Sequence, residues 1–547
     1  MTPKRVLTTV AAAALALVAA AAALSLAARL PAEVHGRPAP TVAAPPWEAG
    51  GELPRSFDLR TLGWVTPVRE QQGYSTCWVM ACTGALESRV VRETGSAPDY
   101  SENNLANHMA SRLFFEGMAP AELALAYWAR WEGPVPERDD PYPAPLGSPT
   151  FLRAARHVED VLFLPPRRGP LDNDAIKWAL MTYGAVDAEM AWEKEDWNPD
   201  TNAYYASGGT PDHHVLCVGW DDDFPASRFR TRPPGDGAFL IKNSWGTDFG
   251  ADGYFWLSYY DAVFGRRTMV VARTARRDDF DAVYQYDALG RSAWWGDGTE
   301  DAWFANRFRC AGSGDLQAVA FYTPVVDTSF EVRVAGSLDA VATAPVVAAG
   351  TLAVPGYHTV RLDTAVRLRT GDAFVVAVRV HAPGWERPVA VERKSALIAP
   401  RARPGQSFVS ADGRSWRDLT GLRGDRTSNV CLKAFLVAAG DGDRLPPRTA
   451  VRAGDVRAGG TLRVAWRLDD PAFSCASAIV VLRVRDAAGR VRASRRIPAV
   501  AVGERGTWTL RAGWPPGTYR ASAVAFDVAG HRQPAASADT FRVLPAQ

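Results

Sequence analysis

The chain has 547 residues, of which 47% are hydrophobic and 10% are aromatic. At roughly 150 residues per domain this length predicts three or four domains, and the composition is sufficient for packed cores. The 62 Lys and Arg residues nearly balance the 60 Asp and Glu residues, which leaves a net charge of +2. Because the basic residues form no stripe, we expect no nucleic acid partner.

Residues 1–29 have the composition of an export segment. Two basic residues precede an alanine-rich apolar run over residues 6–28. The segment can be interpreted either as a cleaved signal peptide or as an uncleaved membrane anchor, because about 20 apolar residues can span a bilayer. Either one directs the rest of the chain outward. We therefore expect an exported protein, extracellular or anchored to the outer face of the cytoplasmic membrane, with residues 30–52 as a proline-rich linker.

Three motifs in a fixed order point to the chemistry. QQGYSTCW contains Cys77, DHHVLCVGWD contains His213, and KNSWG contains Asn243. Ser75-Thr76 can cap a helix, and an apolar run follows, so we expect Cys77 in the first turn of a helix. A helix start and a neighbouring imidazolium both stabilise a thiolate, so we expect a thiol pKa well below its free value of roughly 8.5. This order predicts a thiol hydrolase.

The motifs resemble those of the papain-like (C1 family) cysteine peptidases. LPRSFDLRTLGWVTPVREQQGYSTCW is similar to the mature start of that family, and DHHVLCVGWD and IKNSWGTDFGADGYFWLSY match its later motifs. The resemblance covers residues 53–268. It implies a two-lobed α+β domain with a strand-rich half and a helical half, the latter built from residues 77–93, 101–130 and 172–184.

The resemblance also implies a catalytic role for each motif residue. Cys77 attacks the scissile carbonyl, and His213 holds the ion pair and protonates the leaving amine. Asn243 fixes the orientation of the imidazole. Gln71, six residues before the nucleophile, donates its amide to the developing oxyanion.

Two further residues are assigned to substrate binding by the same resemblance. Trp245 shields the histidine–asparagine bond from water. Gly117, in FFEGMAP, is similar to the glycine segment that pairs with the substrate backbone, although a loop glycine is more often a turn residue. His108 is expected to pack against its neighbours rather than to bind a ligand.

Two adjacent pairs of like residues require a choice. Gln71 has the six-residue offset from the cysteine, and Gln72 does not. HHVLCVGW is expected to be a strand, on which neighbouring side chains point to opposite faces. Only one of the two can therefore face Cys77, and the resemblance to the family's Asn/Asp-His-Ala-Val pattern selects His213. The same strand geometry argues against a metal site formed by His213 and His214.

The remaining cysteines give little indication of chemistry. Cys82 and Cys217 are expected to be buried packing groups. Cys310 and Cys431 belong to the next domain, and the sequence does not decide whether they form a disulfide. Cys475 is expected to be alone in a third domain. No His, Cys or Asp cluster has zinc or iron spacing, and no glycine loop has phosphate-binding spacing, so we expect no metal or cofactor.

After residue 280 the sequence becomes a series of short alternating runs bounded by glycine and proline, which is typical of β-sandwiches. YQYDALG, FANRF and GYHTVRL resemble the lectin-like domain that follows the catalytic domain in a group of bacterial papain-like enzymes. That resemblance implies a glycan or cell-surface ligand, by fold analogy alone. A set of three tryptophans either stacks on a sugar or packs in a core, and we favour packing: Trp294, Trp295 and Trp303.

These observations predict a multidomain chain, an α+β papain-like two-lobed catalytic domain followed by two all-β sandwich domains. The expected boundaries are 53–275 for the peptidase, 280–438 for the lectin-like domain and 446–547 for an immunoglobulin-like domain. We expect an exported cysteine peptidase, by default an endopeptidase, that acts on peptide or protein substrates. The alternative is a catalytically silent adhesive or carbohydrate-binding surface protein that keeps the peptidase fold as a scaffold.

Overall fold

The computed structural model describes most of the chain beyond the N-terminal segment. The described residues are 47, 52–109, 121–142, 148, 152–395, 398–440, 443–470 and 476–546. The export segment, nearly all of the linker, Gly117 and Cys475 lie outside them. Among the described residues, none of the helices has the length and apolar character needed to cross a membrane.

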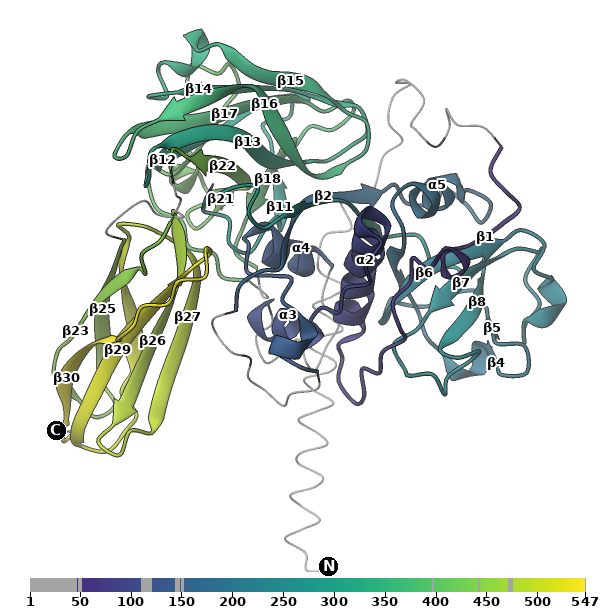
Figure 1. The fold of residues 1–547 in the computed structure, drawn as a ribbon, viewed down its shortest axis with the longest axis horizontal. Coiled ribbons are helices and arrows are strands. Elements are labelled where there is room, and N and C mark those ends of the chain that lie inside the picture. Colours follow the sequence, from purple (N-terminus) through teal and green to yellow (C-terminus); the bar gives the residue numbers. More distant parts are fainter. Residues whose placement is uncertain are drawn as a thin grey trace, which may run out of the picture.

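The helices lie in the first part of the chain, where the sequence predicts them. Figure 1 shows α2 at the centre of this part, with α3 and α4 on one side of it and α5 above the strands on the other. The described α-helices are α2 (Cys77–Thr94), α3 (Glu102–Met109), α4 (Glu122–Ala129) and α5 (Asp174–Thr182).

One sheet runs from the peptidase segment into the segment that follows it. Its order is β10-β22-β13-β16-β2-β9-β3-β6-β7-β8-β5-β4, with β1 paired to β6. The strands of the first segment are β1 (Ser56–Asp58), β2 (Arg156–Leu164), β3 (Val186–Met190), β4 (Trp197–Asn198), β5 (Ala203–Tyr204), β6 (His213–Asp221), β7 (Ala238–Lys242), β8 (Tyr254–Ser258) and β9 (Thr268–Arg276). Those of the second are β10 (Ala282–Tyr284), β13 (Gly314–Thr323), β16 (Gly356–Leu368) and β22 (Leu432–Ala438).

The junction between the two segments is the pairing of β2 with β16. Gly356 lies opposite Leu162, and Tyr357 lies opposite Val161. A Cβ atom on Gly356 would overlap the carbonyl oxygen of Val161, so the strands approach this closely because residue 356 has no side chain. The pairing covers an edge of β2 that would otherwise be open.

Helix α2 is held against the sheet by close contacts along its length. A Cβ atom on Gly84 would lie 2.8 Å from Cδ2 of Leu216 on β6, so the glycine makes room for that side chain. One turn later, the Ser88 hydroxyl oxygen accepts a hydrogen bond from the Ala185 N–H (2.9 Å), just before β3. These contacts set the distance between the start of α2 and the start of β6.

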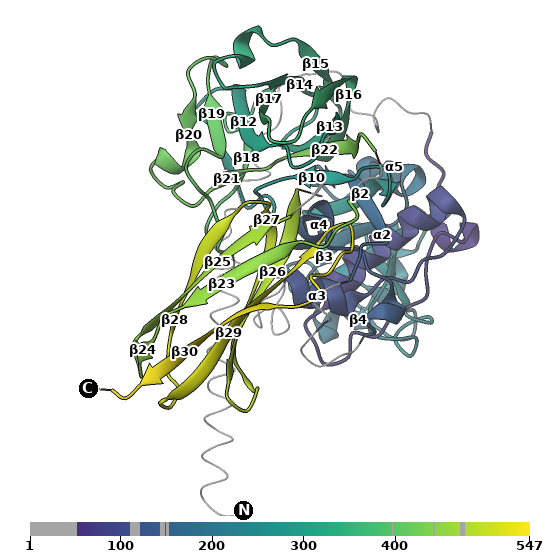
Figure 2. The same cartoon turned by 60° about the vertical axis from the view of Figure 1, so that its left-hand side comes forward.

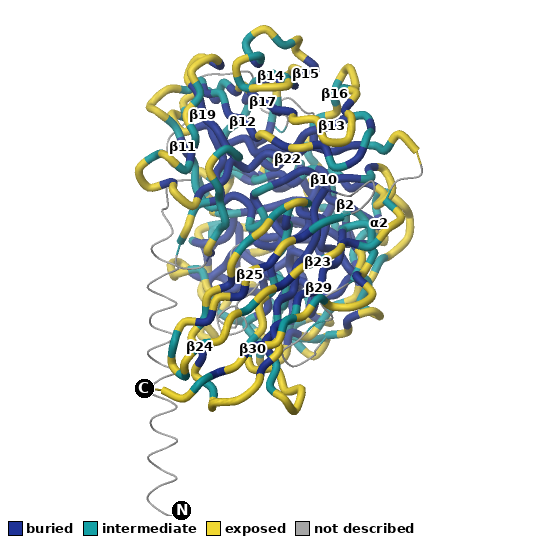
Figure 3. Tube along the Cα trace, turned by 90° about the vertical axis from the view of Figure 1, so that its left-hand side faces the viewer, coloured by how far each residue is buried: buried dark blue, intermediate teal, exposed yellow. Residues whose placement is uncertain are grey.

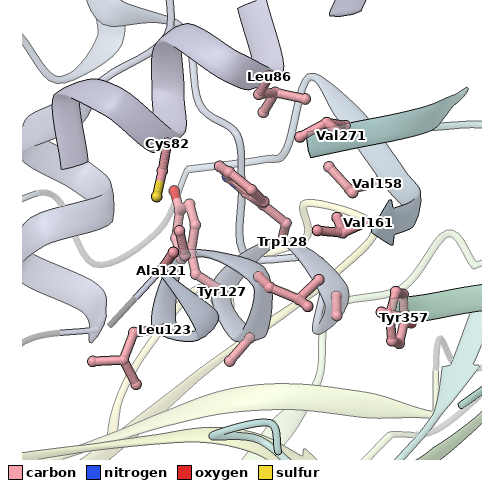
Figure 4. Close-up of a cluster of buried hydrophobic side chains, with 14 of the residues drawn as sticks. Cys82, Leu86, Ala121, Leu123, Tyr127, Trp128, Val158, Val161, Val271 and Tyr357 are labelled. Carbon is pink, nitrogen blue, oxygen red and sulfur yellow. The ribbon is translucent and has the colours of Figure 1, made fainter. Parts of the chain in front are cut away.

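A single apolar core extends across the boundary between the two segments. It contains Trp78 and Trp128 from the peptidase segment and Tyr322, Tyr357 and Phe435 from the following one. Figure 4 shows side chains of α2, α4, β2 and β9 meeting in this core, with Tyr357 at its edge. Because the core is shared, the two segments form a continuous packed unit.

The second segment adds two smaller sheets around its own core. One has the order β15-β14-β17-β12-β19-β20 and the other β11-β18-β21. Their bounds are β11 (Ala293–Trp295), β12 (Asp301–Arg309), β14 (Thr328–Ala335), β15 (Val346–Leu352), β17 (Ala373–His381), β18 (Val389–Glu392), β19 (Ser407–Ser410), β20 (Arg417–Asp418) and β21 (Asn429–Val430).

The three tryptophans considered for sugar stacking are packed against the protein. Trp295 is buried in the core under the Arg417 guanidinium. Trp294 packs against the shared core beneath Arg291, and Trp303 packs in a small cluster beneath Arg333. The preference for packing over sugar stacking agrees with these positions.

The structure overturns one alternative for the cysteines. Cys310 and Cys431 are free thiols in different core clusters, so the disulfide that the sequence left open does not form. The Cys310 thiol instead donates to the carbonyl oxygen of Gly312 (3.1 Å). Cys82 and Cys217 are buried in apolar cores, as expected.

The last part of the chain contains two sheets that enclose one core. Residues of β25 alternate between exposed and buried, as expected for a sandwich strand. Figures 2 and 3 show its long strands below the second segment, with exposed backbone at the far end. The sheets are formed by β23 (Arg448–Ala453), β25 (Thr461–Asp469) and β28 (Arg505–Arg511), and by β24 (Val456–Arg457), β30 (Ser537–Leu544), β29 (Gly517–Asp527), β26 (Ser477–Asp486) and β27 (Val491–Ala501).

A buried ion-pair group joins this last part to the peptidase segment. Glu132, which follows α4, accepts hydrogen bonds from Arg130 and from Arg496 of β27, both at 2.6 Å. Burial opposes the charge of Glu132, but the two guanidiniums outweigh it and lower the pKa of this carboxyl to about 2. One carboxylate therefore compensates two buried cations.

We predict that Glu132→Gln destabilises the protein by about 3–5 kcal/mol, because it leaves two buried guanidiniums without a counterion. Thermal unfolding at pH 7 measures this. The folded pKa is lowered, so the contribution is fully present above the unfolded pKa and is lost as the pH falls towards about 2. Asp315→Asn, which removes the exposed partner of Arg367, is the control and should leave the midpoint unchanged. Equal midpoints for the two variants would contradict the prediction.

Candidate active site

Cys77 is the first residue of α2, as the sequence predicts. Its side chain is buried, with 4% of its surface exposed. The backbone N–H groups of His214 and Trp78 donate hydrogen bonds to the sulfur. The thiol therefore lies between the start of a helix and the first residues of β6.

His213 and Asn243 form the second part of the site. His213 Nε2 donates a hydrogen bond to Asn243 Oδ1 (2.8 Å), which leaves Nδ1 as the basic nitrogen of the ring. The indole of Trp245 stacks on the imidazole, with ring centroids 4.7 Å apart and planes at 25°. This stacking covers the hydrogen bond, which is the role expected of Trp245. Asn243 Oδ1 also accepts from the Ser244 N–H (2.9 Å), which fixes the amide.

Gln71 is held in place by both atoms of its side-chain amide. Nε2 donates to the carbonyl oxygen of Tyr74 (2.7 Å), and Oε1 accepts from the Ser244 hydroxyl (2.6 Å). One proton of Nε2 is left for another acceptor. Gln72 is exposed, with φ at 57°, and its N–H donates to Glu70. The choice of Gln71 over Gln72 is consistent with this difference.

Tyr142 is a site residue that the sequence did not reveal. Its hydroxyl donates to the carbonyl oxygen of Gln71 (2.8 Å) and lies 2.7 Å from Thr76 Oγ1. Thr76 occupies the N-cap position of α2 but makes no side-chain capping bond, so the expected capping role is wrong. The Thr76 hydroxyl bonds to the Tyr142 hydroxyl instead. The loop from Gln71 to Thr76 is therefore held at both ends by the side chain of Tyr142. No motif spacing points to a residue 65 positions after Cys77.

A buried set of charges supports the strand and loop that approach Gln71. Lys242 Nζ donates to the carbonyl oxygen of Thr66 (2.8 Å), and the Thr66 hydroxyl donates to Glu87 of α2 (2.5 Å). Glu87 also accepts from the N–H of Tyr100 (2.9 Å). Burial lowers the pKa of Lys242 to about 8, although Glu87 opposes this shift.

Burial disfavours charge on both Cys77 and His213. Burial raises the pKa of the Cys77 thiol to about 11, and the two backbone N–H groups only partly oppose this. Burial lowers the pKa of His213 to about 4, although the bond to Asn243 opposes it. Burial thus shifts the thiol pKa in the direction opposite to the one expected from the sequence, because the loss of water outweighs the effect of the helix start.

His214 points to the opposite face of β6 from His213. Its Nδ1 donates to Asp187 Oδ1 (3.0 Å), and its Nε2 lies 3.9 Å from Glu189. Burial disfavours its charge, but Asp187 and Glu189 outweigh this and raise the pKa of His214. The charge on His214 in turn lowers the pKa of His213. The two histidines have different partners, so they form no metal site together.

Among the described residues, one group of side chains has atoms close enough to share a metal ion, and it lies far along the chain from the catalytic residues. Asp443, Asp527 and His531 have ligand atoms within 4.8 Å of one another. His531 Nδ1 is 3.3 Å from Asp527, so a histidine–carboxylate pair already accounts for the contact. His108 bonds to Asn104 through Nδ1 (2.8 Å) and packs near Tyr127, as expected of a packing residue.

Comparison with known families identifies the two segments. Residues 53–274 match the sequence model of the papain family cysteine protease. Residues 53–274 are a papain-family cysteine protease domain. Residues 283–436 match the lectin like domain, and they follow the protease domain in the order expected.

Curated relatives resemble the protease domain. A cathepsin L-like peptidase of Aedes aegypti is 31% identical over 212 residues, which are 38% of this chain and 59% of that protein. Procathepsin L of Felis catus is 31% identical over 216 residues, which are 37% of this chain and 60% of that protein. The chain thus spans less than two thirds of the length of either relative.

Solved structures share the two-domain fold. The cysteine protease and lectin-like domains of Cwp84, a surface layer associated protein of Clostridium difficile, match with a TM-score of 0.62 and 23% identity, over 74% of this chain and 93% of that one. Cwp84 after propeptide cleavage matches with a TM-score of 0.63 and 24% identity, over 70% of this chain and 99% of that one. The papain-like domain followed by a lectin-like all-β domain is therefore an architecture found in another protein.

We predict that His214→Gln raises the pKa of His213 and that Asn243→Ala lowers it. The first change removes a nearby positive charge, and the second removes the bond that favours the imidazolium. NMR titration of labelled histidine in a Cys77→Ala background measures both shifts without requiring activity. His381→Gln, a half-exposed site in the lectin-like domain, is the control. Shifts of the same sign in both variants would be inconsistent with these electrostatics.

Proposed function

We propose that residues 53–275 hydrolyse peptide bonds by thiol catalysis, with Cys77, His213 and Asn243 as the catalytic triad. The observation that carries the proposal is the hydrogen bond from His213 to Asn243 beneath Trp245, beside a cysteine at the start of α2. This combination of nucleophile, base and orienting group is the Cys-His-Asn form of the triad.

In the first half of the reaction, Cys77 Sγ forms a bond to the scissile carbonyl carbon, and the thiol proton passes to Nδ1 of His213. His213 acts as the adjacent general base, so the thiol is activated at the moment of attack even though burial disfavours charge on both groups. The oxyanion accepts hydrogen bonds from the Cys77 N–H and from Nε2 of Gln71. His213 then gives its proton to the leaving amine, and a thioester remains.

In the second half, His213 takes a proton from water as the water oxygen attacks the thioester carbon. The tetrahedral adduct collapses, the C–S bond breaks, and the acid is released as the proton returns to Cys77. Asn243 keeps the imidazole oriented through both proton transfers. An amine in place of water would give transpeptidation by the same residues.

The catalytic arrangement favours an enzyme over a silent scaffold. A scaffold requires neither the buried His213–Asn243 bond nor the double anchoring of Gln71 by Tyr74 and Ser244. Both arrangements leave an atom for a substrate, Nδ1 of His213 and one Nε2 proton of Gln71, which a scaffold does not need.

We also propose that the protein is exported and that its lectin-like domain has a glycan ligand. The basic residues and apolar run of residues 1–29 support export, and the surface-layer association stated for Cwp84 is consistent with it. Membrane attachment through an uncleaved segment stays an alternative to release. An immunoglobulin-like spacer at residues 446–547 is supported by the two sheets around one core.

We predict that Gln71→Ala lowers kcat on internally quenched peptides by roughly 10²–10³-fold with little change in KM, because the amide acts on the transition state. Gln72→Asn in the same loop is the matched control, since asparagine tolerates positive φ. It should retain activity, and Cys77→Ala should have none. Equal kcat for the Gln71 and Gln72 variants would remove Gln71 from the oxyanion site, and an active Cys77→Ala would overturn the proposed function.

A further inference from the structure

A cavity of about 200 Å³ lies between the lectin-like domain and the last part of the chain. The lectin-like domain contributes residues 286, 288 and 289, Glu392 and the loop 399–406, and the last part contributes residues 495–499 of β27 and Glu504. Figure 2 shows the end of β27 directly below β18 and β21. The cavity is smaller than the ~300 Å³ at which pockets for drug-sized ligands begin, so it suits a small chemical group.

Cations outnumber anions around this cavity. Four arginines line it: Arg401, Arg403, Arg495 and Arg496. Glu504, at the rim, is shared by Arg401 and Arg403, the latter at 2.8 Å. Glu132, behind the wall, is shared by Arg496 and Arg130. Each of these two carboxylates therefore compensates two guanidiniums.

Arg495 is the cation that the cavity leaves uncompensated. Its guanidinium is exposed and forms no hydrogen bond or ion pair with the described residues. Its effect on its neighbours is repulsive: burial, together with the charges of Arg403 and Arg495, lowers the pKa of Arg401 to about 10. An anion bound between these side chains would relieve the repulsion.

The second carboxyl group of the lining contributes little negative charge. Glu392 accepts hydrogen bonds from the Leu289 N–H (2.6 Å) and from Asn429 Nδ2 (2.7 Å). Burial raises the pKa of Glu392 to about 8, so the group is mostly protonated at neutral pH. The excess of positive charge in the cavity is therefore not cancelled by this residue.

The uncharged parts of the wall suit a sugar ring. Pro400, Ile497 and Pro498 offer apolar surface for the C–H face of a ring. Gln406 accepts a hydrogen bond from the Arg403 N–H (3.1 Å), and its Nε2 has no partner among the described residues. An amide donor beside apolar surface is suited to a hydroxyl-bearing ligand. Most of the lining lies within the lectin-like domain.

We propose that this cavity binds an acidic sugar residue, whose carboxylate or phosphate lies between Arg403 and Arg495 and whose ring packs on Pro400 and Ile497. Guanidinium groups bind carboxylate and phosphate oxygens in pairs, which gives both affinity and orientation. Because residues of β27 complete the cavity, the bound sugar also fixes the last part of the chain to the lectin-like domain. The proposal deepens the glycan-ligand part of the proposed function and is independent of its peptidase part.

The test uses the full chain carrying Cys77→Ala, which prevents self-digestion, and calorimetry with D-galacturonate, D-galactose and inorganic phosphate. We expect galacturonate to bind at least about tenfold more tightly than galactose, since hydrogen bonds to charged groups contribute more than neutral ones. Arg495→Gln should weaken galacturonate binding about tenfold or more, and Arg403→Gln should do the same with Arg401 still paired to Glu504. Arg463→Gln, an exposed arginine on β25 away from the cavity, should change nothing.

Each remaining outcome overturns part of the proposal. Equal affinities for galactose and galacturonate, or binding unaffected by Arg495→Gln, would show that the cavity does not recognise the acidic group of the sugar. If inorganic phosphate bound as tightly as galacturonate, the cavity would be a simple anion site and the sugar ring would contribute nothing to binding. Neither result depends on peptidase activity, so a failure here is separate from a failure of the catalytic proposal.

Discussion

The packing of α2 against β6 is the constraint on which the active site depends. The absence of a side chain at Gly84 lets Leu216 approach the helix, and this contact lies two turns after Cys77 and three residues after His213. The start of α2, with Cys77, therefore lies beside the first residues of β6 although 136 positions separate Cys77 from His213 in the sequence. The hydrogen bonds of Gln71, Tyr142 and Asn243 are built around this one helix–strand contact.

The same sheet ties the catalytic domain to the rest of the chain. The pairing of β2 with β16 and the shared core at Tyr357 and Phe435 make the lectin-like domain a continuation of the peptidase. Arg496 of β27 adds a third attachment through Glu132. A ligand in the cavity would contact the lectin-like domain and the last part of the chain, and the attachments to the peptidase would keep the glycan and peptide sites at a fixed distance from each other.

Sequence motifs are most informative where chemistry requires fixed residues in a fixed order. Cys77, His213, Asn243 and Gln71 could be predicted because their offsets and flanking motifs are specific. Tyr142 could not, since its hydrogen bonds depend on how a distant loop folds back. Burial could not be predicted from the sequence either. It raises the pKa of the Cys77 thiol, where the sequence led us to expect a lowered pKa. It also places Cys310 and Cys431 in separate cores. Pairing of strands distant in sequence, such as β2 with β16, leaves no local pattern.

The central claim is that Cys77 is an activated nucleophile served by His213. Labelling of the full chain with an epoxysuccinyl thiol-peptidase inactivator, followed by intact mass and peptide mapping, tests it most directly. The account predicts one adduct, on Cys77, that is absent in Cys77→Ala and forms much more slowly in His213→Ala, while the buried thiols Cys82 and Cys217 stay unmodified. No adduct on reduced, folded protein, or equal labelling rates with and without His213, would contradict the claim.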